Sequence, residues 1–160
     1  MDWRFDDLAP GDAGWVAGRH GALYARDEGY DHRFEAVVLR LLADFLEGRD
    51  PARERAWIAR DGEGRRLGCV FCTRPSARDA KLRMFLVEPE ARGTGLAPAL
   101  LARCIAFARD TGAARLTLWT HESHRAAGRL YARTGFRLTG ETPVEAFGQP
   151  TLEQTWVLDL

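Results

Sequence analysis

The 160-residue sequence predicts an α/β (α+β) fold. We expect a central mixed sheet of six to seven strands, mostly antiparallel with one parallel pair, flanked by about four helices. Segments with the two-residue period of strands alternate with segments of helical period. A strand, loop, helix and strand run through residues 81–120 as a crossover unit, which requires a parallel pair. The length suits one domain, 1–160, large enough to bury a core and hold a cleft.

The first part of the chain predicts one strand and two helices. Residues 3–8 alternate as a short strand, which Pro10-Gly11-Asp12 ends. The helix that follows holds Trp15, Val16 and Leu23. After Glu28-Gly29-Tyr30-Asp31, a second helix has apolar residues at a period of 3.6 and ends near Gly48. These apolar residues are Phe34, Val37, Val38, Leu41, Leu42 and Phe45.

A three-stranded meander is predicted next. Two apolar-rich runs, 55–60 and 66–73, flank Asp61-Gly62-Glu63-Gly64, which has the composition of a hairpin turn. Residues 81–87 form the third strand, which Pro89 stops. The three strands should therefore pair antiparallel.

The last part of the chain predicts two helices between strands. A long helix over about 95–111 ends at Gly112, and a shorter one over 124–133 has Ser123 as its N-cap and ends at Gly135. The remaining strands are expected at 116–120, 136–141 and 152–158.

The composition excludes several classes of protein. Apolar residues make up 46% and charged residues 29% of the chain, which is typical of a soluble globular protein and not of a disordered one. Lys and Arg together number 23, and so do Asp and Glu together, so the formal net charge is zero. The chain therefore has no global basic field that would attract nucleic acid or anionic lipid. No apolar run approaches the roughly 20 residues of a membrane span, and the start leads into no signal-peptide core. We therefore expect a cytoplasmic location, with neither nucleic acid nor a membrane as partner.

The three cysteines predict free thiols. Their odd number suits a reducing compartment better than a disulfide framework. Cys69 and Cys72 have CxxC spacing, yet they lie in a strand, where positions three apart face opposite sides of the sheet. We expect no metal site.

Arg92-Gly93-Thr94-Gly95 lies between a strand and a helix, where free N–H groups and the helix dipole favour anions. The two glycines allow close approach of a ligand, and Arg92 adds charge. Glycines at this place also serve turns alone, so the segment is open to both interpretations. A P-loop is excluded because the only lysine is Lys81, upstream in the strand, and a dinucleotide fingerprint fails because Pro98 replaces its third glycine.

These residues resemble the GNAT superfamily of acyl-CoA-dependent N-acyltransferases over nearly the whole chain. Arg92-Gly93-Thr94-Gly95-Leu96-Ala97 matches the family motif Arg/Gln-x-x-Gly-x-Gly/Ala, and Val87-Glu88-Pro89-Glu90-Ala91 is a common lead-in. Leu130-Tyr131-Ala132-Arg133-Thr134-Gly135-Phe136 looks like the second family signature. The start of the chain, Leu118-Trp119-Thr120 and the C-terminal segment also resemble the acetyltransferase half of MarR-like regulator fusions. The winged-helix half is absent from this sequence, so transcriptional regulation is not expected.

The resemblance implies roles for particular residues. The strand carrying Leu86 and Val87 would present main-chain groups to the pantetheine arm of acetyl-CoA, and Arg92, Gly93, Thr94, Gly95, Leu96 and Ala97 would hold its pyrophosphate. Tyr131 would be the general acid, because a phenol of pKa about 10 can protonate a thiolate. Packing of Tyr131 against the sheet is the alternative.

His121 stands where many relatives have an Asn that contacts the cofactor. It either binds the cofactor, acts near the amine or is a solvated loop histidine, whereas His124 and His32 look like solvated helix residues. A base for the amine is needed, and the candidates, each of which is also a plausible surface charge, are Glu35, Glu28, His20 and Glu145. Aromatic residues that either line an acceptor pocket or belong to the core are Trp15, Tyr24, Tyr30 and Phe147.

The sequence thus predicts an acetyl-CoA-dependent N-acetyltransferase that acts on a primary amine by direct attack in a ternary complex. The acceptor is a small molecule or a peptide amine, and a homodimer is left open. The alternative is a non-catalytic acyl-CoA-binding sensor or regulatory module, which needs the anion site without a proton-transfer group.

Overall fold

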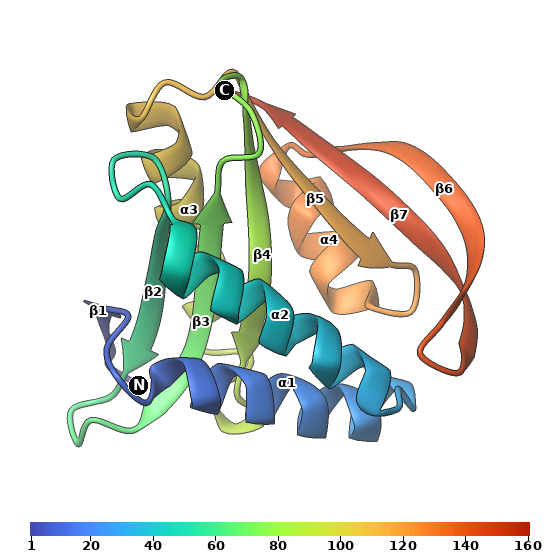
Figure 1. The fold of residues 1–160 in the computed structure, drawn as a ribbon, viewed down its shortest axis with the longest axis horizontal. Coiled ribbons are helices and arrows are strands. Elements are labelled where there is room, and N and C mark those ends of the chain that lie inside the picture. The colour runs from blue at the N-terminus through green and yellow to red at the C-terminus, as the bar shows by residue number, and fades with distance from the viewer.

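The computed structural model describes residues 1–160 and contains one seven-stranded sheet (Figure 1). The strands are β1 (Arg4–Asp7), β2 (Arg55–Arg60), β3 (Arg66–Thr73), β4 (Asp79–Val87), β5 (Arg115–His121), β6 (Arg137–Ala146) and β7 (Gln149–Asp159). Their order in the sheet is β1-β2-β3-β4-β5-β7-β6, and only β4 and β5 pair in parallel. The fold class expected from the sequence is confirmed.

Four α-helices connect the strands: α1 (Asp12–Glu28), α2 (His32–Gly48), α3 (Leu96–Asp110) and α4 (Arg125–Thr134). A short 3₁₀ turn, η1 (Pro89–Ala91), precedes α3. Asp31 caps α2 by accepting a hydrogen bond from the Arg33 N–H, and Gly135 ends α4 in the left-handed conformation. The expected cap at Ser123 is wrong, because α4 begins one residue later with His124 at the N-cap and no side-chain cap.

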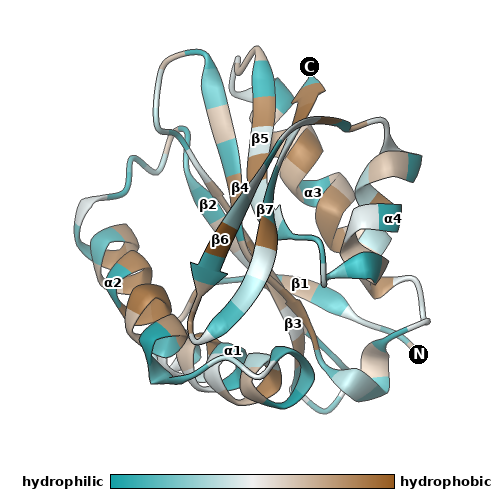
Figure 2. Ribbon diagram, turned by 90° about the vertical axis from the view of Figure 1, so that its right-hand side faces the viewer, coloured by the Kyte–Doolittle hydropathy of each residue, from teal (hydrophilic) through white to brown (hydrophobic).

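The sheet separates two hydrophobic cores. α1 and α2 cover one face, and α3 and α4 cover the other, as the side view shows (Figure 2). Cys69 belongs to the core under α1 and α2, and Cys72 belongs to the core under α3 and α4, so the two thiols face opposite sides as expected. All three cysteines are free and buried. None of the helices is long and apolar enough to cross a membrane.

The C-terminal hairpin is longer than the sequence indicated. β6 and β7 pair continuously from Arg137 opposite Val157 to Ala146 opposite Gln149, apart from one register shift. Polar residues and prolines interrupt the apolar alternation, which hides these strand ends from a pattern search. Pro143 is tolerated because β6 is an edge strand with one neighbour.

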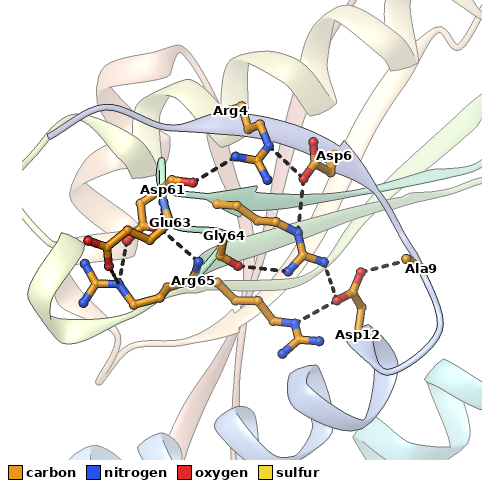
Figure 3. Close-up of polar contacts among 10 residues, drawn as sticks. Arg4, Asp6, Ala9, Asp12, Asp61, Glu63, Gly64 and Arg65 are labelled. Carbon is orange, nitrogen blue, oxygen red and sulfur yellow. Dashed lines mark hydrogen bonds and ion pairs between the residues drawn. The ribbon is translucent and has the colours of Figure 1, made fainter.

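A buried carboxylate fixes the start of α1 to the β2–β3 hairpin. Asp12 is fully buried and accepts hydrogen bonds from the Ala9 N–H at 2.9 Å, from Arg60 at 2.6 Å and from Arg66 at 2.8 Å. Figure 3 shows Asp12 among the polar groups of this corner, together with Arg4, Asp6 and Asp61. Burial alone would raise the pKa of Asp12, but these hydrogen bonds outweigh it and the pKa is lowered.

The Asp12→Asn substitution should lower the free energy of unfolding by about 3 kcal/mol, because it leaves two partly buried guanidinium groups without their shared anion. Urea unfolding at pH 7 measures the loss. Asp6→Asn is the matched control, since Asp6 also pairs with Arg60 but is about one-third exposed, and it should cost less than about 1 kcal/mol. Equal losses for the two variants would contradict a special role of the buried carboxylate.

Candidate functional site

β4 and β5 open a cleft in the middle of the sheet. They pair only through Asp79, Ala80 and Lys81 of β4, opposite residues 115–117 of β5. Beyond this point the two strands separate, while β5 stays paired with β7 along its whole length (Figure 1). The edge of β4 from Leu82 onward therefore faces no strand on this side, which leaves backbone groups available to a ligand.

A bulge in β4 turns its side chains beside this cleft. Met84 has a φ of 48°, in the left-handed region that a non-glycine residue rarely adopts. At this point the register with β3 shifts, so that Phe71 pairs with Arg83 and Cys69 pairs with Leu86. Ala80 and Leu82 consequently belong to the core under α3 and α4, whereas Met84 and Leu86 belong to the core under α1 and α2.

The glycine loop lines a cavity of about 630 Å³, which we call the loop cavity. Gly93 and Gly95 have φ values of 74° and 93°, and neither they nor Thr94 donates its N–H to a protein group. Leu96 and Ala97 begin α3, where the first N–H groups have no partner within the helix. Such donors and the dipole of a helix favour an anion at this place.

The predicted residues of this segment take different positions. Leu86, Val87, Arg92, Gly93, Gly95 and Ala97 line the loop cavity. Leu96 is fully buried in the core, and the Thr94 hydroxyl donates to the Ala91 carbonyl, so these two residues contribute backbone rather than side chain to the site. Arg92 is about half exposed and contacts Asp27 at 3.2 Å.

Three arginines of α4 were not singled out from the sequence. Arg125, Arg129 and Arg133 follow one another at a spacing of four residues and line the loop cavity. All three are exposed, and none pairs with a carboxylate. Spacing of four on a helix puts side chains on one face, so this row was readable in the sequence. It adds positive charge opposite the glycine loop.

A second cavity of about 970 Å³ lies beside the first, and we call it the aromatic cavity. Tyr24, Tyr30, Phe34 and Phe147 line it, and their rings pack at centroid distances from 4.7 to 5.9 Å. The residues that line both cavities are Tyr24, Phe85, His124 and Ala127. The two cavities therefore meet between α1, β4 and α4.

Two histidines and a tyrosine form a hydrogen-bonded group where the cavities meet. The Tyr30 hydroxyl lies 2.5 Å from Nδ1 of His121 and 3.4 Å from Nε2 of His124. Nε2 of His124 is 3.5 Å from the Glu28 carboxylate, and its Nδ1 is 3.2 Å from the Thr120 hydroxyl. His121 lines the aromatic cavity and not the loop cavity.

Burial keeps both imidazoles neutral at pH 7. It lowers the pKa of His124 to about 4, with the neighbouring His121 adding to the effect. It also lowers the pKa of His121, against the opposing influence of Glu153 and Glu28. The expectation that His124 is a solvated helix residue is wrong, because its side chain is only 14% exposed. His32 is exposed, as expected.

Tyr131 lies on α4 at the wall of the aromatic cavity and is 4% exposed. Its ring packs against Phe136 and Trp156 at centroid distances of 5.6 and 6.2 Å. Its hydroxyl makes no hydrogen bond within the protein, and burial raises its pKa well above the usual value. Tyr131 is therefore a protonated phenol whose donor is available to a ligand.

The other site residues expected from the sequence do not lie together in one place. Glu145 lines the aromatic cavity but is exposed, Glu35 lines neither cavity, and Trp15 stacks on Arg66 outside both. His20 lines the aromatic cavity and is 3% exposed, with Nδ1 donating to the Val16 carbonyl and Nε2 unpartnered. No cluster of three His, Cys, Asp or Glu side chains suits a metal ion.

Comparison with known proteins identifies the family. A model of the acetyltransferase (GNAT) family matches residues 20–136, which is most of the chain. The chain belongs to the GNAT family. Its resemblance to this family in sequence is thereby confirmed, while the narrower likeness to MarR-like fusions stays a prediction.

Relatives of this GNAT chain match it over part of their length. An uncharacterized N-acetyltransferase of Mycobacterium tuberculosis is 36% identical over 86 residues, or 54% of this chain and 55% of the relative. A mycothiol acetyltransferase of Salinispora tropica is 40% identical over 84 residues, or 49% of this chain and 27% of the relative. The chain spans about half or less of the length of these curated relatives.

Solved structures share the fold of this GNAT chain. A GCN5-related N-acetyltransferase from Kribbella flavida superposes with a TM-score of 0.80 at 23% identity, covering 99% of this chain and 98% of the other. A spermidine N-acetyltransferase from Vibrio cholerae, in complex with CoA and spermine, has a TM-score of 0.75 at 17% identity, covering 98% and 95%. At these identities the likeness concerns the fold alone.

The buried His20 should make this GNAT protein sensitive to mild acid. Burial lowers its pKa to about 4, from about 6.5 in the unfolded chain. The unfolded state therefore binds the proton first, and the stability present above pH 6.5 falls as the pH drops from 6.5 toward 4. Between pH 7 and 5.5 the loss from His20 should be about 1 kcal/mol, measured by urea unfolding at each pH.

His20→Phe should remove this share of the pH dependence, because a phenyl ring takes no proton. His32→Ala is the control, since His32 is exposed, and its pH dependence should match that of the wild type. An unchanged pH dependence in His20→Phe would contradict a depressed pKa at this position.

Proposed function

We propose that this chain is an acetyl-CoA-dependent N-acetyltransferase that transfers an acetyl group to a primary amine by direct attack in a ternary complex. The observation that carries the proposal is the meeting of the two cavities. One has free N–H groups and an arginine row, as a pyrophosphate requires, and the other has neutral imidazoles and a free phenol. A ternary complex needs two sites that open on one another.

The loop cavity has the donors that acetyl-CoA needs. The N–H groups of Gly93, Thr94 and Gly95 would hold the pyrophosphate, with Arg92 released from Asp27 to add a charged contact. Leu86 and Val87 would present the unpaired edge of β4 to the pantetheine arm. Acetyl-CoA supplies the acetyl group as an activated thioester.

His121 is the base that the geometry favours. Its neutral imidazole lines the aromatic cavity, and the Tyr30 hydroxyl fixes its ring through Nδ1. When the Nδ1–H group donates a hydrogen bond to the Tyr30 hydroxyl, Nε2 is free to accept a proton from the substrate ammonium, and the neutral amine that results attacks the thioester. Glu153 and Glu28 favour the charged imidazole that results. Of the four bases expected from the sequence, only Glu28 takes part, through His124.

Tyr131 would serve the leaving group. Because its pKa lies above that of a thiol, full proton transfer to a thiolate is uphill, and the hydroxyl acts chiefly by donating a hydrogen bond to the developing charge. Because burial raises its pKa, this hydroxyl is protonated at pH 7. The sequence predicts Tyr131 as a general acid that protonates the thiolate, whereas we propose that it donates a hydrogen bond to the thiolate.

Replacing arginines of the α4 row should weaken acetyl-CoA binding. We expect Arg129→Ala to raise the Kd for CoA about 3- to 10-fold, because one charged contact to a phosphate is lost, with a smaller effect at high salt. Calorimetry at two salt concentrations measures this. Arg137→Ala is the control, since Arg137 is exposed on β6 and pairs with Asp159 away from the cavity, and it should leave the Kd unchanged. Equal effects of both variants would contradict the assignment.

Thiol release from acetyl-CoA with a panel of primary amines tests the reaction itself. Tyr131→Phe should lower kcat about 100-fold with little change in CoA affinity, because the ring and its packing remain. His121→Gln should lower kcat and flatten the acidic limb of the pH profile. Tight CoA binding without amine-dependent thiol release in the wild type would instead establish an acyl-CoA sensor.

A further inference from the structure

Two cations of β4 line the aromatic cavity without a carboxylate partner. Lys81, the only lysine of the chain, is 7% exposed, and Arg83 is half-buried. Both line the aromatic cavity, and neither forms a hydrogen bond or an ion pair with the protein. Arg60 and Arg66, by contrast, share the buried carboxylate of Asp12. A buried cation without a counter-ion costs free energy, so this arrangement needs an explanation.

Regular alternation in β4 orients these two side chains. Lys81 and Arg83 are two residues apart in a strand, so both point to the same face of the sheet. They pair opposite Thr73 and Phe71 of β3, just before the register shift at Met84. The cavity into which they point is closed on its far side by residues of α2 and by the β6–β7 turn.

Lys81 and Arg83 are surrounded by groups that do not neutralise their charge. Nζ of Lys81 lies 3.3 Å from the centroid of the Trp119 ring. The ring attracts a cation, but it carries no negative charge that would neutralise one. Burial lowers the pKa of Lys81 to about 8, with nearby Arg83 adding to the effect, and burial lowers the pKa of Arg83 as well. An anion in the cavity would offset both costs.

One carboxylate of the cavity, Glu153, acts on both Lys81 and the proposed base. Glu153 of β7 lies opposite His121 of β5 in the sheet register and forms no ion pair with Lys81, but its charge raises the pKa of Lys81 as well as that of His121. Trp119 and His121 are two residues apart on β5 and point to one face, which separates them by roughly 7 Å. The cavity is therefore positive near Lys81 and has a carboxylate near the proposed base.

We propose that the acceptor is an amine that also carries an anionic oxyacid group, a carboxylate or a phosphonate, and that Lys81 and Arg83 bind this group. Its amine then lies toward His121 and Glu153. This inference rests on the proposed acetyl transfer and names its substrate class as amino acids or aminophosphonates. A polyamine or simple alkylamine would leave both cations uncompensated and is disfavoured by them.

Acetyl transfer to the free amino acids, to their carboxamides and to the α-aminophosphonate analogues tests the proposal. At least one free amino acid or aminophosphonate should exceed its neutral amide in kcat/KM by about 10- to 100-fold, as for a charged hydrogen-bonded group. The ratio of kcat/KM between the amino acids and the α-aminophosphonates identifies the preferred anion. In Lys81→Met/Arg83→Leu the preference should vanish through a higher KM for the anionic acceptor, while turnover of the amide persists. Arg40→Leu, an exposed cation of α2 at the same cavity, is the matched control and should keep the preference.

Thermal unfolding separates binding from folding. Because the two cations are unpaired, the double variant should unfold at or above the temperature of the wild type. Amides turned over as well as their amino acids by the wild type, or a preference that survives in the double variant, would overturn the proposal.

If no amine is acetylated, calorimetry with the same amino acids and amides decides. If the wild type binds amino acids more tightly than their amides and the double variant does not, the proposed anion site is supported and the proposed transferase activity is rejected. Binding of neither, or equal binding of both, would reject the anion site as well.

Discussion

The separation of β4 from β5 is the constraint on which the rest of the site depends. Once the parallel pairing ends at Lys81, the inner edge of β4 has no strand beside it, and its backbone groups must find other partners. The bulge at Met84 occurs where this edge becomes free. Lys81 and Arg83, which precede the bulge, line the aromatic cavity, and Phe85, which follows it, lines both cavities. A regular, fully paired strand would close the cleft.

The chain keeps several groups in the interior at a cost to stability. His20 has an unpartnered nitrogen, His124 is held neutral far below its usual pKa, and Lys81 and Arg83 have no counter-ion. All four line the aromatic cavity. The corner around Asp12, where every charge is paired, shows that the fold can satisfy buried ions where no ligand is needed. Arg74 also has two buried nitrogens without a partner and lines neither cavity, but four such residues around one cavity are typical of a site adapted to a ligand.

Local patterns were sufficient for much of the fold. Residues only a few positions apart in the chain determine the helical periods of α1 to α4, the turn at residues 61–64 and the crossover from β4 to β5. The hairpin of β6 and β7 did not, because its strands are polar and half exposed, and their length depends on pairing with each other. His124 was misjudged for a similar reason. A histidine beside charged and small residues looks solvated, and only α1 and the Tyr30 loop, distant in sequence, bury it.

The sequence by itself determined the family and the residues of the proposed donor site, since the glycine loop and the helix it begins are contiguous in the chain. Free N–H groups at Gly93 to Gly95 follow from local backbone geometry, which needs no distant partner. The proposed acceptor site is visible only in the tertiary structure. It is lined by Tyr30, His121, Lys81 and Glu153, which come from four separate segments and share a cavity because of the strand order. Chemistry assembled across the sheet has no spacing that a sequence pattern can reveal.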